Sequence, residues 1–186
     1  MRRSHLQIRP RRRVFLGCEG ESERGFGGAL QWFLDESGPH VYLDLVTLEP
    51  GGDPLALVDR AKCRIEERQR KHGSYERRAV LLDADRLGQK PDRDAQIQGL
   101  ARSAKMTLIW QHPCHEALLL RHLIGCGQLR PQSCADAFTA LRRRWPDYKK
   151  GLSAVELAER IGEQQIRQAM AVEPEFGNFL RSLGVR

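Results

Sequence analysis

The sequence predicts an α/β fold with a mainly parallel sheet of about four strands, helices on both faces and additional C-terminal helices. Three observations lead to this prediction. Short apolar runs alternate four times with segments whose apolar residues recur at helical spacing, which is typical of a parallel sheet covered by helices. The 186 residues suit one domain, since domains contain roughly 150 residues. Acidic residues follow the first and third apolar runs, at the sheet edge where such folds bind ligands.

Turn residues mark the first two strand-and-helix units. An apolar run at 14–18 ends at Glu19 and is followed by apolar residues at helical spacing. A second run at 40–48 is closed by the turn-forming segment EPGGDP. Within that segment Asp53 can cap a helix and Pro54 can begin it. We therefore expect the order strand, helix, strand, helix.

Two further units follow the same pattern. The apolar run at 79–82 ends in the sequence DAD, and a polar stretch then leads to a helix at about 95–104. The run at 106–110 is the fourth expected strand, and Pro113 opens the next helix, which extends to about His122.

The C-terminal part of the chain is expected to be helical. Apolar spacing predicts helices at about 135–144 and 155–170. Ser153 and Glu156 have the spacing of a capping box and would begin the second of these helices.

The distribution of charge suggests a basic arm in front of a nearly neutral body. The formal net charge is +7, but the first thirteen residues hold six Arg and no acid, which leaves 25 basic and 24 acidic residues after them. We divide the chain into a basic flexible arm (1–13), a core (14–130) and a C-terminal helical extension packed on that core (131–186). The arm either binds a nucleic-acid backbone without sequence selectivity or serves as a solubility tail.

Composition excludes several other classes of protein. A hydrophobic share of 40% with charges throughout the chain argues against global disorder. No apolar run approaches the roughly 18 residues that a membrane span requires. The five cysteines are odd in number and unlike a secreted disulfide scaffold, and the Arg-rich start lacks the apolar segment of a secretory signal. We expect a cytoplasmic protein with no membrane partner.

Carboxylates at the strand ends predict a metal site. Asp83 and Asp85 are two residues apart, so their side chains converge if the strand geometry persists. Glu19, at the end of another strand, could complete a site for Mg²⁺ or Mn²⁺, and a metal held there would stabilise a phosphoryl group. Glu21 and Glu23 could add ligands or a general base. In the structural alternative these acids are only turn and cap residues, because Asp is common after strands.

Several segments resemble a known family. VFLGCEGESERGF followed by AVLLDAD resembles the Toprim domain, whose signature is a Glu after the first strand and an Asp-x-Asp after a later one. IWQHPCHEALLLRHL resembles the asparagine-proline-cysteine-phenylalanine-glutamate helix motif of RloB-like proteins, and PDYKKG resembles their downstream Tyr-x-Lys segment. The resemblance covers roughly residues 13 to 150 and implies a Toprim-like, Rossmann-like fold.

The resemblance also implies roles for individual residues. Glu19 matches the Toprim glutamate, a general acid/base or metal ligand, and Asp83 and Asp85 match the metal-binding pair. The helix motif and the downstream segment match Cys114, Glu116, His122, Tyr148 and Lys150, with Lys149 as the alternative to Lys150. His112, His115 and Leu118 depart from the family pattern, which puts substrate contacts in doubt more than metal binding. The proposed catalytic set is Glu19, Glu23, Asp83, Asp85 and Glu116.

A zinc site and a reactive cysteine are alternatives in the same region. The ligand types needed for zinc are present in His112, Cys114, His115, His122 and Cys126, but no CxxC pair occurs. Near a helix N-terminus the Cys114 thiol could be acidic and nucleophilic, although a packed cysteine is the commoner case. His122 is as well explained by helix packing as by function.

Two internal basic clusters could contact nucleic acid. Residues 60–78 contain eight Lys or Arg, and we interpret them as a solvated helix face. In RRRWPDYKK, aromatic residues alternate with cations, a combination that grips phosphates and stacks on unpaired bases. The predicted nucleic-acid-binding residues are His112, His115, His122, Arg144, Trp145, Tyr148, Lys149 and Lys150.

Three functions remain open at this stage. The resemblance implies a Mg²⁺- or Mn²⁺-dependent nuclease acting on RNA or DNA, often encoded beside an ATPase partner and associated with defence against phage. The second hypothesis is a non-catalytic nucleic-acid-binding or adaptor subunit of such a complex. The third is a zinc-stabilised interaction module. The chain could also form a homo-oligomer.

Overall fold

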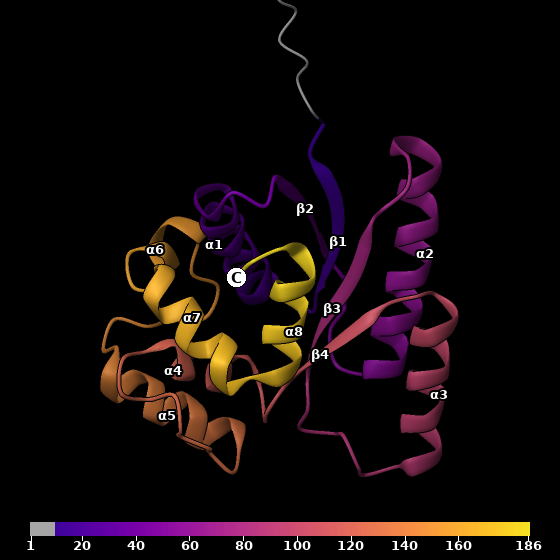
Figure 1. Ribbon diagram of the computed structural model, residues 1–186. Helices are drawn as coiled ribbons and strands as arrows, with labels where there is room; N and C mark the ends of the chain where they lie inside the picture. Colours follow the sequence, from indigo (N-terminus) through magenta and orange to yellow (C-terminus); the bar gives the residue numbers. More distant parts are fainter. Residues whose placement is uncertain (1–9) are drawn as a thin grey trace, which may run out of the picture.

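The computed structural model describes residues 10–186 and contains a parallel four-stranded sheet between two layers of helices (Figure 1). The strands are β1 (Arg12–Cys18), β2 (Val41–Thr47), β3 (Arg77–Asp83) and β4 (Thr107–Gln111). They lie in the order β2-β1-β3-β4, with every neighbouring pair parallel. The predicted α/β class with helices on both faces is confirmed.

The helices fall into two groups. On one face of the sheet lie α2 (Pro54–His72) and α3 (Pro91–Ser103). The other face and its extension carry α1 (Glu21–Ser37), α4 (His115–His122), α5 (Cys134–Arg144), α6 (Ala154–Ala158), α7 (Glu163–Val172) and α8 (Pro174–Leu183). This larger layer includes the whole C-terminal part of the chain.

Local sequence signals account for several helix starts. The Asp53 side chain accepts a hydrogen bond from the amide of Ala56 at 3.2 Å, and Pro54 is the first residue of α2, as predicted. The predicted capping box of Ser153 and Glu156 begins α6. At the start of α1 the Glu23 side chain accepts a hydrogen bond from the amide of Gly20. Each cap satisfies backbone donors that the first helical turn leaves without intrahelical partners.

Some predicted boundaries were wrong. The helix expected at 155–170 is two helices, because the chain turns after Ala158 and Gly162 then caps α7. Pro113 does not open α4, which begins at His115 with Cys114 as its cap. The final helix, α8, was not predicted, although Pro174 at its first position is a typical start signal.

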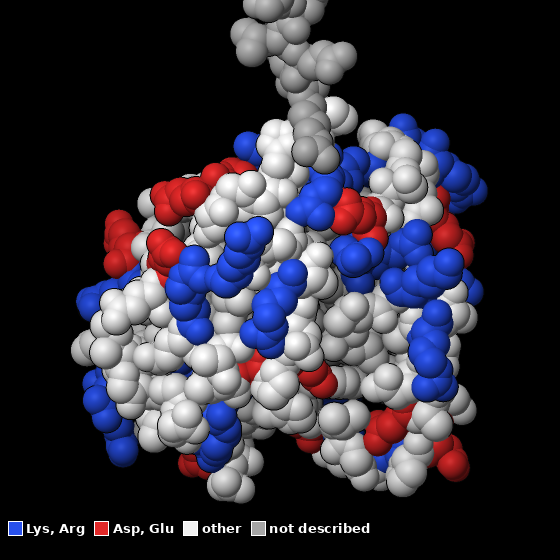
Figure 2. Space-filling model, viewed as in Figure 1, with Lys and Arg blue, Asp and Glu red and all other residues white. Residues whose placement is uncertain are grey.

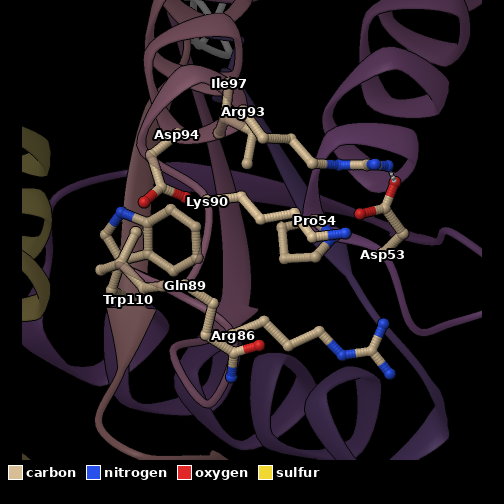
Figure 3. Close-up of a pocket in the computed structure, with 10 residues that line it drawn as sticks. Asp53, Pro54, Arg86, Gln89, Lys90, Arg93, Asp94, Ile97 and Trp110 are labelled. Atoms are coloured by element: carbon tan, nitrogen blue, oxygen red, sulfur yellow. Dashed lines mark hydrogen bonds and ion pairs between the residues drawn. The ribbon is translucent and has the colours of Figure 1, made fainter.

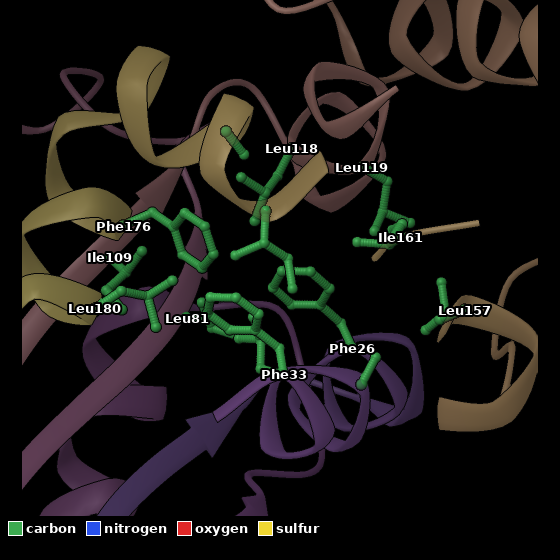
Figure 4. Close-up of a cluster of buried hydrophobic side chains, with 14 of the residues drawn as sticks. Phe26, Phe33, Leu81, Ile109, Leu118, Leu119, Leu157, Ile161, Phe176 and Leu180 are labelled. Atoms are coloured by element: carbon green, nitrogen blue, oxygen red, sulfur yellow. The ribbon is translucent and has the colours of Figure 1, made fainter. Parts of the chain in front are cut away.

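Two hydrophobic clusters lie on opposite faces of the sheet. The larger one joins α1, α4 and the C-terminal helices to the sheet. Figure 4 shows Phe26 and Phe33 of α1 meeting Leu118 of α4 and Phe176 of α8. The C-terminal extension therefore shares its core with residues 14–130, and burial of these side chains stabilises both together, by about 1.5–3 kcal/mol for each large apolar residue.

Two glycines of α1 let the C-terminal segment approach closely. A Cβ atom on Gly25 would lie 2.1 Å from the carbonyl oxygen of Leu152, and one on Gly28 would lie 2.6 Å from the Cβ atom of Ala154. Any larger residue would push this segment away from α1.

The predicted arm ends earlier than residue 13. Arg12 and Arg13 belong to β1, where Arg12 forms an ion pair with Glu76 at 2.8 Å and Arg13 forms one with Asp44 at 3.1 Å. These two arginines are therefore structural. Arg11 forms an ion pair with Asp35 at 3.0 Å, and residues 1–9 of the predicted arm lie outside the described residues.

Charges on α2 largely pair with one another or with the sheet. Glu67 forms ion pairs with Arg64 and Lys71, and Arg68 pairs with Asp44. Figure 2 shows basic side chains over this side of the molecule with acidic ones among them. This agrees with the interpretation of residues 60–78 as a solvated helix face. Among residues 10–186 no helix combines the length and the apolar character needed to cross a membrane.

Candidate active site

Asp83 occupies the carboxyl end of β3 and connects it to α4. Its Oδ1 atom accepts a hydrogen bond from the amide of His115, the first residue of α4, at 2.9 Å. The following amide, of Ala84, donates to the carbonyl oxygens of Gln111 and Pro113 at 3.1 and 2.9 Å. These bonds fix the Asp83 carboxylate at the N-terminus of α4, where the helix dipole favours negative charge.

Two further acids are buried beside this position. Glu23 is 6% exposed and Glu116 is 5% exposed. One Glu23 oxygen accepts a hydrogen bond from the amide of Gly20 at 3.1 Å, so this residue also has a structural role as part of the α1 cap. Glu116 lies in the first turn of α4 and accepts a hydrogen bond from the Cys114 thiol at 3.2 Å. Buried acids are costly unless they are paired or hydrogen-bonded.

Electrostatic repulsion couples these acids. Burial, followed by the charges of Glu23, Glu19 and Glu116, raises the pKa of Asp83 to about 8. Burial and the charges of Glu23 and Asp85 also raise the pKa of Glu19, against the opposing effect of hydrogen bonds from the backbone. We call Glu19, Glu23, Asp83 and Glu116 the carboxylate cluster. It holds more negative charge than the surrounding groups neutralise, so it favours a proton or a cation.

Lys150 is the cation next to this cluster. Its Nζ atom lies 3.1 Å from Oε1 of Glu116, while 70% of the Lys150 side chain remains exposed. Burial acts to raise the pKa of Glu116, but hydrogen bonds from Cys114 and Lys150 outweigh it and the pKa is lowered. Lys149 instead forms an ion pair with Glu156 at 3.6 Å. Of the two candidate lysines, only Lys150 lies against the carboxylate cluster.

The position of Lys150 depends on α1. The amide of Gly151 donates a hydrogen bond to the Ser22 hydroxyl at 2.9 Å. The close approach of Leu152 to Gly25 brings the same segment onto the first turns of α1. Residues far apart in sequence thus meet at the point where α1 and α4 both begin.

Glu19 and Asp85 do not converge with Asp83 in the way that the sequence predicted. β3 ends at Asp83, so the extended geometry that would align Asp85 with it does not persist, and Asp85 is exposed in the following turn. Glu19 accepts a hydrogen bond from the amide of Gly52 at 2.9 Å. Across residues 10–186, no three His, Cys, Asp or Glu side chains form a group that could hold a metal ion. Glu19, Asp83 and Asp85 therefore do not form the three-ligand arrangement expected from the sequence.

Four of the predicted nucleic-acid-binding residues are buried in the core. Trp145 and Tyr148 are 5% and 3% exposed, and their rings pack on each other with centroids 5.6 Å apart. His115 and His122 are 2% and 0% exposed and contact the Phe26 ring. The expectation that these aromatic side chains meet nucleic acid is corrected, because their apolar neighbours already cover them. The signal was ambiguous, since aromatic residues between cations also occur where a helix end docks onto a core.

Burial also decides the protonation of His122. Its Nδ1 atom bonds to the carbonyl oxygen of Leu118 at 2.8 Å, and burial lowers its pKa to about 4. His122 is therefore neutral at pH 7 and acts as a packing residue. The other predicted contact residues, His112, Arg144, Lys149 and Lys150, are exposed.

Cys114 is not poised as a nucleophile. It is 1% exposed, and burial, followed by hydrogen bonding to Cys134 and the charge of Glu116, raises the pKa of its thiol. A protonated buried thiol is a poor nucleophile. Because the proposed zinc ligands around it are divided between the core and the surface, with His112 exposed and His122 buried, the zinc alternative loses its geometric basis.

Sequence reasoning missed a second group of residues at the same sheet edge. Arg86, Lys90, Arg93 and Trp110 line a pocket together with Asp94. The available signal was a series of cations just after β3, in the segment DADRLGQKPDR. These residues form a pocket only because α3 packs beside α2 and β4. Local sequence does not reveal that packing.

Comparison with known proteins adds no assignment. No protein-family model, curated protein or solved structure matches this chain. The fold and the geometry of its sheet edge thus define the class of the molecule, an α/β protein with a carboxylate cluster at the ends of parallel strands.

Proposed function

We propose that the chain is a Mg²⁺- or Mn²⁺-dependent nuclease that hydrolyses phosphodiester bonds of RNA or DNA at the carboxylate cluster. The observation that carries this proposal is the placement of Asp83 beside Glu19 and the buried Glu23 and Glu116. Burial and these three charges raise the pKa of Asp83 to about 8. A group so destabilised as an anion gains most from a divalent cation. A strongly perturbed pKa at the edge of a parallel sheet is also a marker of a functional site.

No three ligand side chains of residues 10–186 converge on one point, so a cation would be held by fewer carboxylates. Mg²⁺ takes oxygen ligands and usually keeps several waters, binding through one or two carboxylates together with substrate phosphates. Asp83 and Glu19 would supply these carboxylates, with Asp85 close enough to interact electrostatically with Glu19. A divalent cation held there supplies a Lewis acid for the phosphoryl oxygens and a more acidic bound water.

The chain's own residues would bind and orient the substrate. Lys150, exposed and held by Glu116, is positioned to neutralise a phosphate. Asp83 must lose its proton before it can bind a cation, so activity should rise with pH. Glu23 has one oxygen occupied by the Gly20 amide, and its second oxygen is the candidate acceptor for a proton from the attacking water.

The cellular context of this proposal comes from the sequence resemblance. The resemblance to RloB-like Toprim proteins suggests a cytoplasmic effector of defence against phage that works with an ATPase. The residues that match the family motifs are Glu19, Asp83, Asp85, Cys114, Glu116, His122, Tyr148 and Lys150.

Cleavage assays test the proposal. Labelled tRNA, other RNA and DNA are incubated with the full chain in Mg²⁺, Mn²⁺ or chelator, with and without the neighbouring ATPase. Asp83→Asn and Glu19→Gln are expected to reduce cleavage by about a thousandfold, comparable to the loss of other strong electrostatic groups in active sites. Asp59→Asn, at an exposed α2 position, should match the wild type. Cleavage that survives both cluster variants, or that persists in chelator, would refute the assigned site.

The adaptor function is a second candidate supported by a specific observation. Glu19 and Glu23 each accept a hydrogen bond from a backbone amide, of Gly52 and Gly20 respectively. Such bonds suit residues that only stabilise loops. Nucleic-acid binding without cleavage, in every metal and with the ATPase present, would favour this function.

A further inference from the structure

A pocket lies at the same sheet edge as the carboxylate cluster but on the α2 and α3 side. Its volume is about 310 Å³. The walls come from the start of α2, the loop between β3 and α3 and the first turns of α3, with Trp110 of β4 at one side (Figure 3). None of its lining residues belongs to the carboxylate cluster.

The two ends of this pocket differ in chemistry. Figure 3 shows the indole of Trp110 and the carboxylate of Asp94 at one end, and the Lys90 amino group and the Arg86 guanidinium group toward the opposite end, near Asp53. Leu87 and Ile97 extend the apolar wall next to Trp110. One end therefore suits a planar apolar group with a polar edge, and the other suits an anion.

The charged side chains of the pocket differ in how many ion pairs and hydrogen bonds they form. Asp53 is neutralised by its ion pair with Arg93 and by the amide of Ala56. Asp94 accepts one hydrogen bond, from the amide of Gly88 at 2.8 Å, through Oδ2. Within residues 10–186, Arg86 and Lys90 form no ion pair, and the buried Nε atom of Arg93 has no hydrogen-bond partner. The pocket thus retains cationic donors and one carboxylate oxygen for a ligand.

We propose that this pocket binds a single phosphorylated nucleoside unit. The base lies at the apolar end of the pocket against Leu87 and the small exposed part of Trp110, whose side chain is otherwise buried, while the free oxygen of Asp94 accepts a hydrogen bond from an amino or hydroxyl group of the nucleoside. Arg86 and Lys90 bind the phosphate through charge-assisted hydrogen bonds. The volume is at the small end of the roughly 300–1,000 Å³ found for small-molecule sites, which suits one nucleotide unit.

Two kinds of molecule contain such a phosphorylated nucleoside unit. A free nucleotide would make the pocket a site for a small signalling or regulatory molecule. The phosphorylated end of a nucleic-acid strand would make it a substrate-positioning subsite beside the carboxylate cluster. Binding itself needs no cleavage, so the proposal does not depend on nuclease activity.

Calorimetric titration of the full chain in chelator tests the pocket. The probes are AMP, adenosine, inorganic phosphate and an RNA pentanucleotide with a 5′-phosphate or a 5′-hydroxyl. Each is titrated into the wild type, Arg86→Gln, Lys90→Gln and Arg70→Gln. Arg86 and Lys90 are exposed, so their variants should fold, and Arg70, exposed near the far end of α2, is a control with the same change of charge.

The expected result is that AMP binds at least tenfold more tightly than adenosine or phosphate. Each pocket variant should weaken AMP binding by roughly tenfold, the loss of one charge-assisted hydrogen bond, and Arg70→Gln should not. Similar affinity for AMP and the pentanucleotide supports the free nucleotide as the ligand. Tenfold tighter binding of the 5′-phosphorylated pentanucleotide supports the strand end.

Three results would overturn the proposal. The first is that neither AMP nor the phosphorylated pentanucleotide binds at millimolar concentration. The second is that phosphate binds as tightly as AMP. The third is that AMP binding is unchanged in both pocket variants. Because the titration contains no metal, its outcome is separate from that of the cleavage assay. A negative result in the titration does not affect the interpretation of the cleavage assay, and a negative result in the cleavage assay does not affect the interpretation of the titration.

Discussion

Asp83 and Asp53 are the same residue type at the same edge of one sheet, yet their pKa values shift in opposite directions. Asp83 is surrounded by other carboxylates, and burial and their charges raise its pKa to about 8. At Asp53 burial acts in the same direction, but the hydrogen bonds from Arg93 and Ala56 outweigh it and the pKa is lowered. One aspartate is a helix cap with its charge satisfied. The other is available for a proton or a metal.

The difference follows from which elements each aspartate meets. Asp53 faces α3, whose first turn brings the guanidinium group of Arg93. Asp83 faces the first turns of α1 and α4, which bring Glu23 and Glu116. Acids are favoured in the first turn of a helix because of the helix dipole. Two such helix starts at one strand end therefore concentrate negative charge there.

The largest expected effect is on the pH dependence of stability. Because the folded pKa of Asp83 is raised above the unfolded value of about 4, its stabilising contribution is complete below pH 4 and is lost as pH rises to about 8. In chelator, Asp83→Asn should remove this loss, on the order of 5 kcal/mol, and should be more stable than the wild type at pH 8. Urea unfolding between pH 5 and 9 measures it.

Asp59→Asn serves as the control for that experiment, since its side chain is exposed on α2. It should follow the wild type at every pH. Mg²⁺ should raise the stability of the wild type at pH 8 and leave Asp83→Asn unchanged. Parallel pH profiles for the wild type and Asp83→Asn would show that the carboxylate cluster does not perturb Asp83.

The two adjacent lysines allow a sharper test of the site. Lys150→Met removes the cation that contacts Glu116, whereas Lys149→Met removes one that contacts Glu156 on α6. We expect cleavage to fall by about 10–100-fold in Lys150→Met, the effect of removing roughly one charge-assisted hydrogen bond to phosphate. Steady-state kinetics should show a change of less than about threefold for Lys149→Met. Equal reductions in both variants would mean that only overall charge matters.

Asp53 is expected to affect stability but not cleavage. Asp53→Ala removes the cap of α2 and the partner of Arg93, at a cost of about 1 kcal/mol at pH 7. Since the folded pKa of Asp53 is lowered, its contribution is present above the unfolded pKa and is lost only as the pH falls below about 4. Urea unfolding at pH 7 and pH 3 checks both statements. A wild-type loss of stability above pH 5 that disappears in Asp53→Ala would contradict them.

The smallest effect concerns the basic N-terminal residues. Deleting residues 1–10 removes three arginines but keeps Arg12 and Arg13, which belong to β1. Nucleic-acid binding should weaken, and the slope of its salt dependence should fall by up to about 0.9 for each phosphate that the deleted arginines neutralise. Metal-dependent cleavage at saturating substrate should be unchanged. Loss of cleavage in a folded deletion variant would place these residues in the active site.

How far the sequence could predict this molecule depends on the range of the interactions. The alternation of apolar runs, the Asp53 cap and the capping box at Ser153 are local, and the structure confirms them. The burial of Trp145 and Tyr148 was not predictable, because it depends on α5 and the following segment docking on the core. The same applies to the pocket at Lys90, where α2 and α3 meet beside Trp110.

The positions of the acids illustrate the same limit. The sequence indicated that Glu19 and Asp83 lie at the ends of two separate strands, and the structure shows that these strands, β1 and β3, are paired. It did not indicate that β3 would end at Asp83, which leaves Asp85 in a turn. The choice of Lys150 over Lys149 required the hydrogen bond between Gly151 and Ser22, which joins residues more than a hundred positions apart.

The central claim is that neighbouring carboxylates hold Asp83 ready for a cation, and NMR titration of its side-chain carboxyl carbon tests it most directly. The signal is assigned by its loss in Asp83→Asn. We predict a pKa of about 8 in chelator, and a clear fall in that pKa when Mg²⁺ is added. An ordinary aspartate pKa near 4 in chelator, unchanged by Mg²⁺, would contradict the claim.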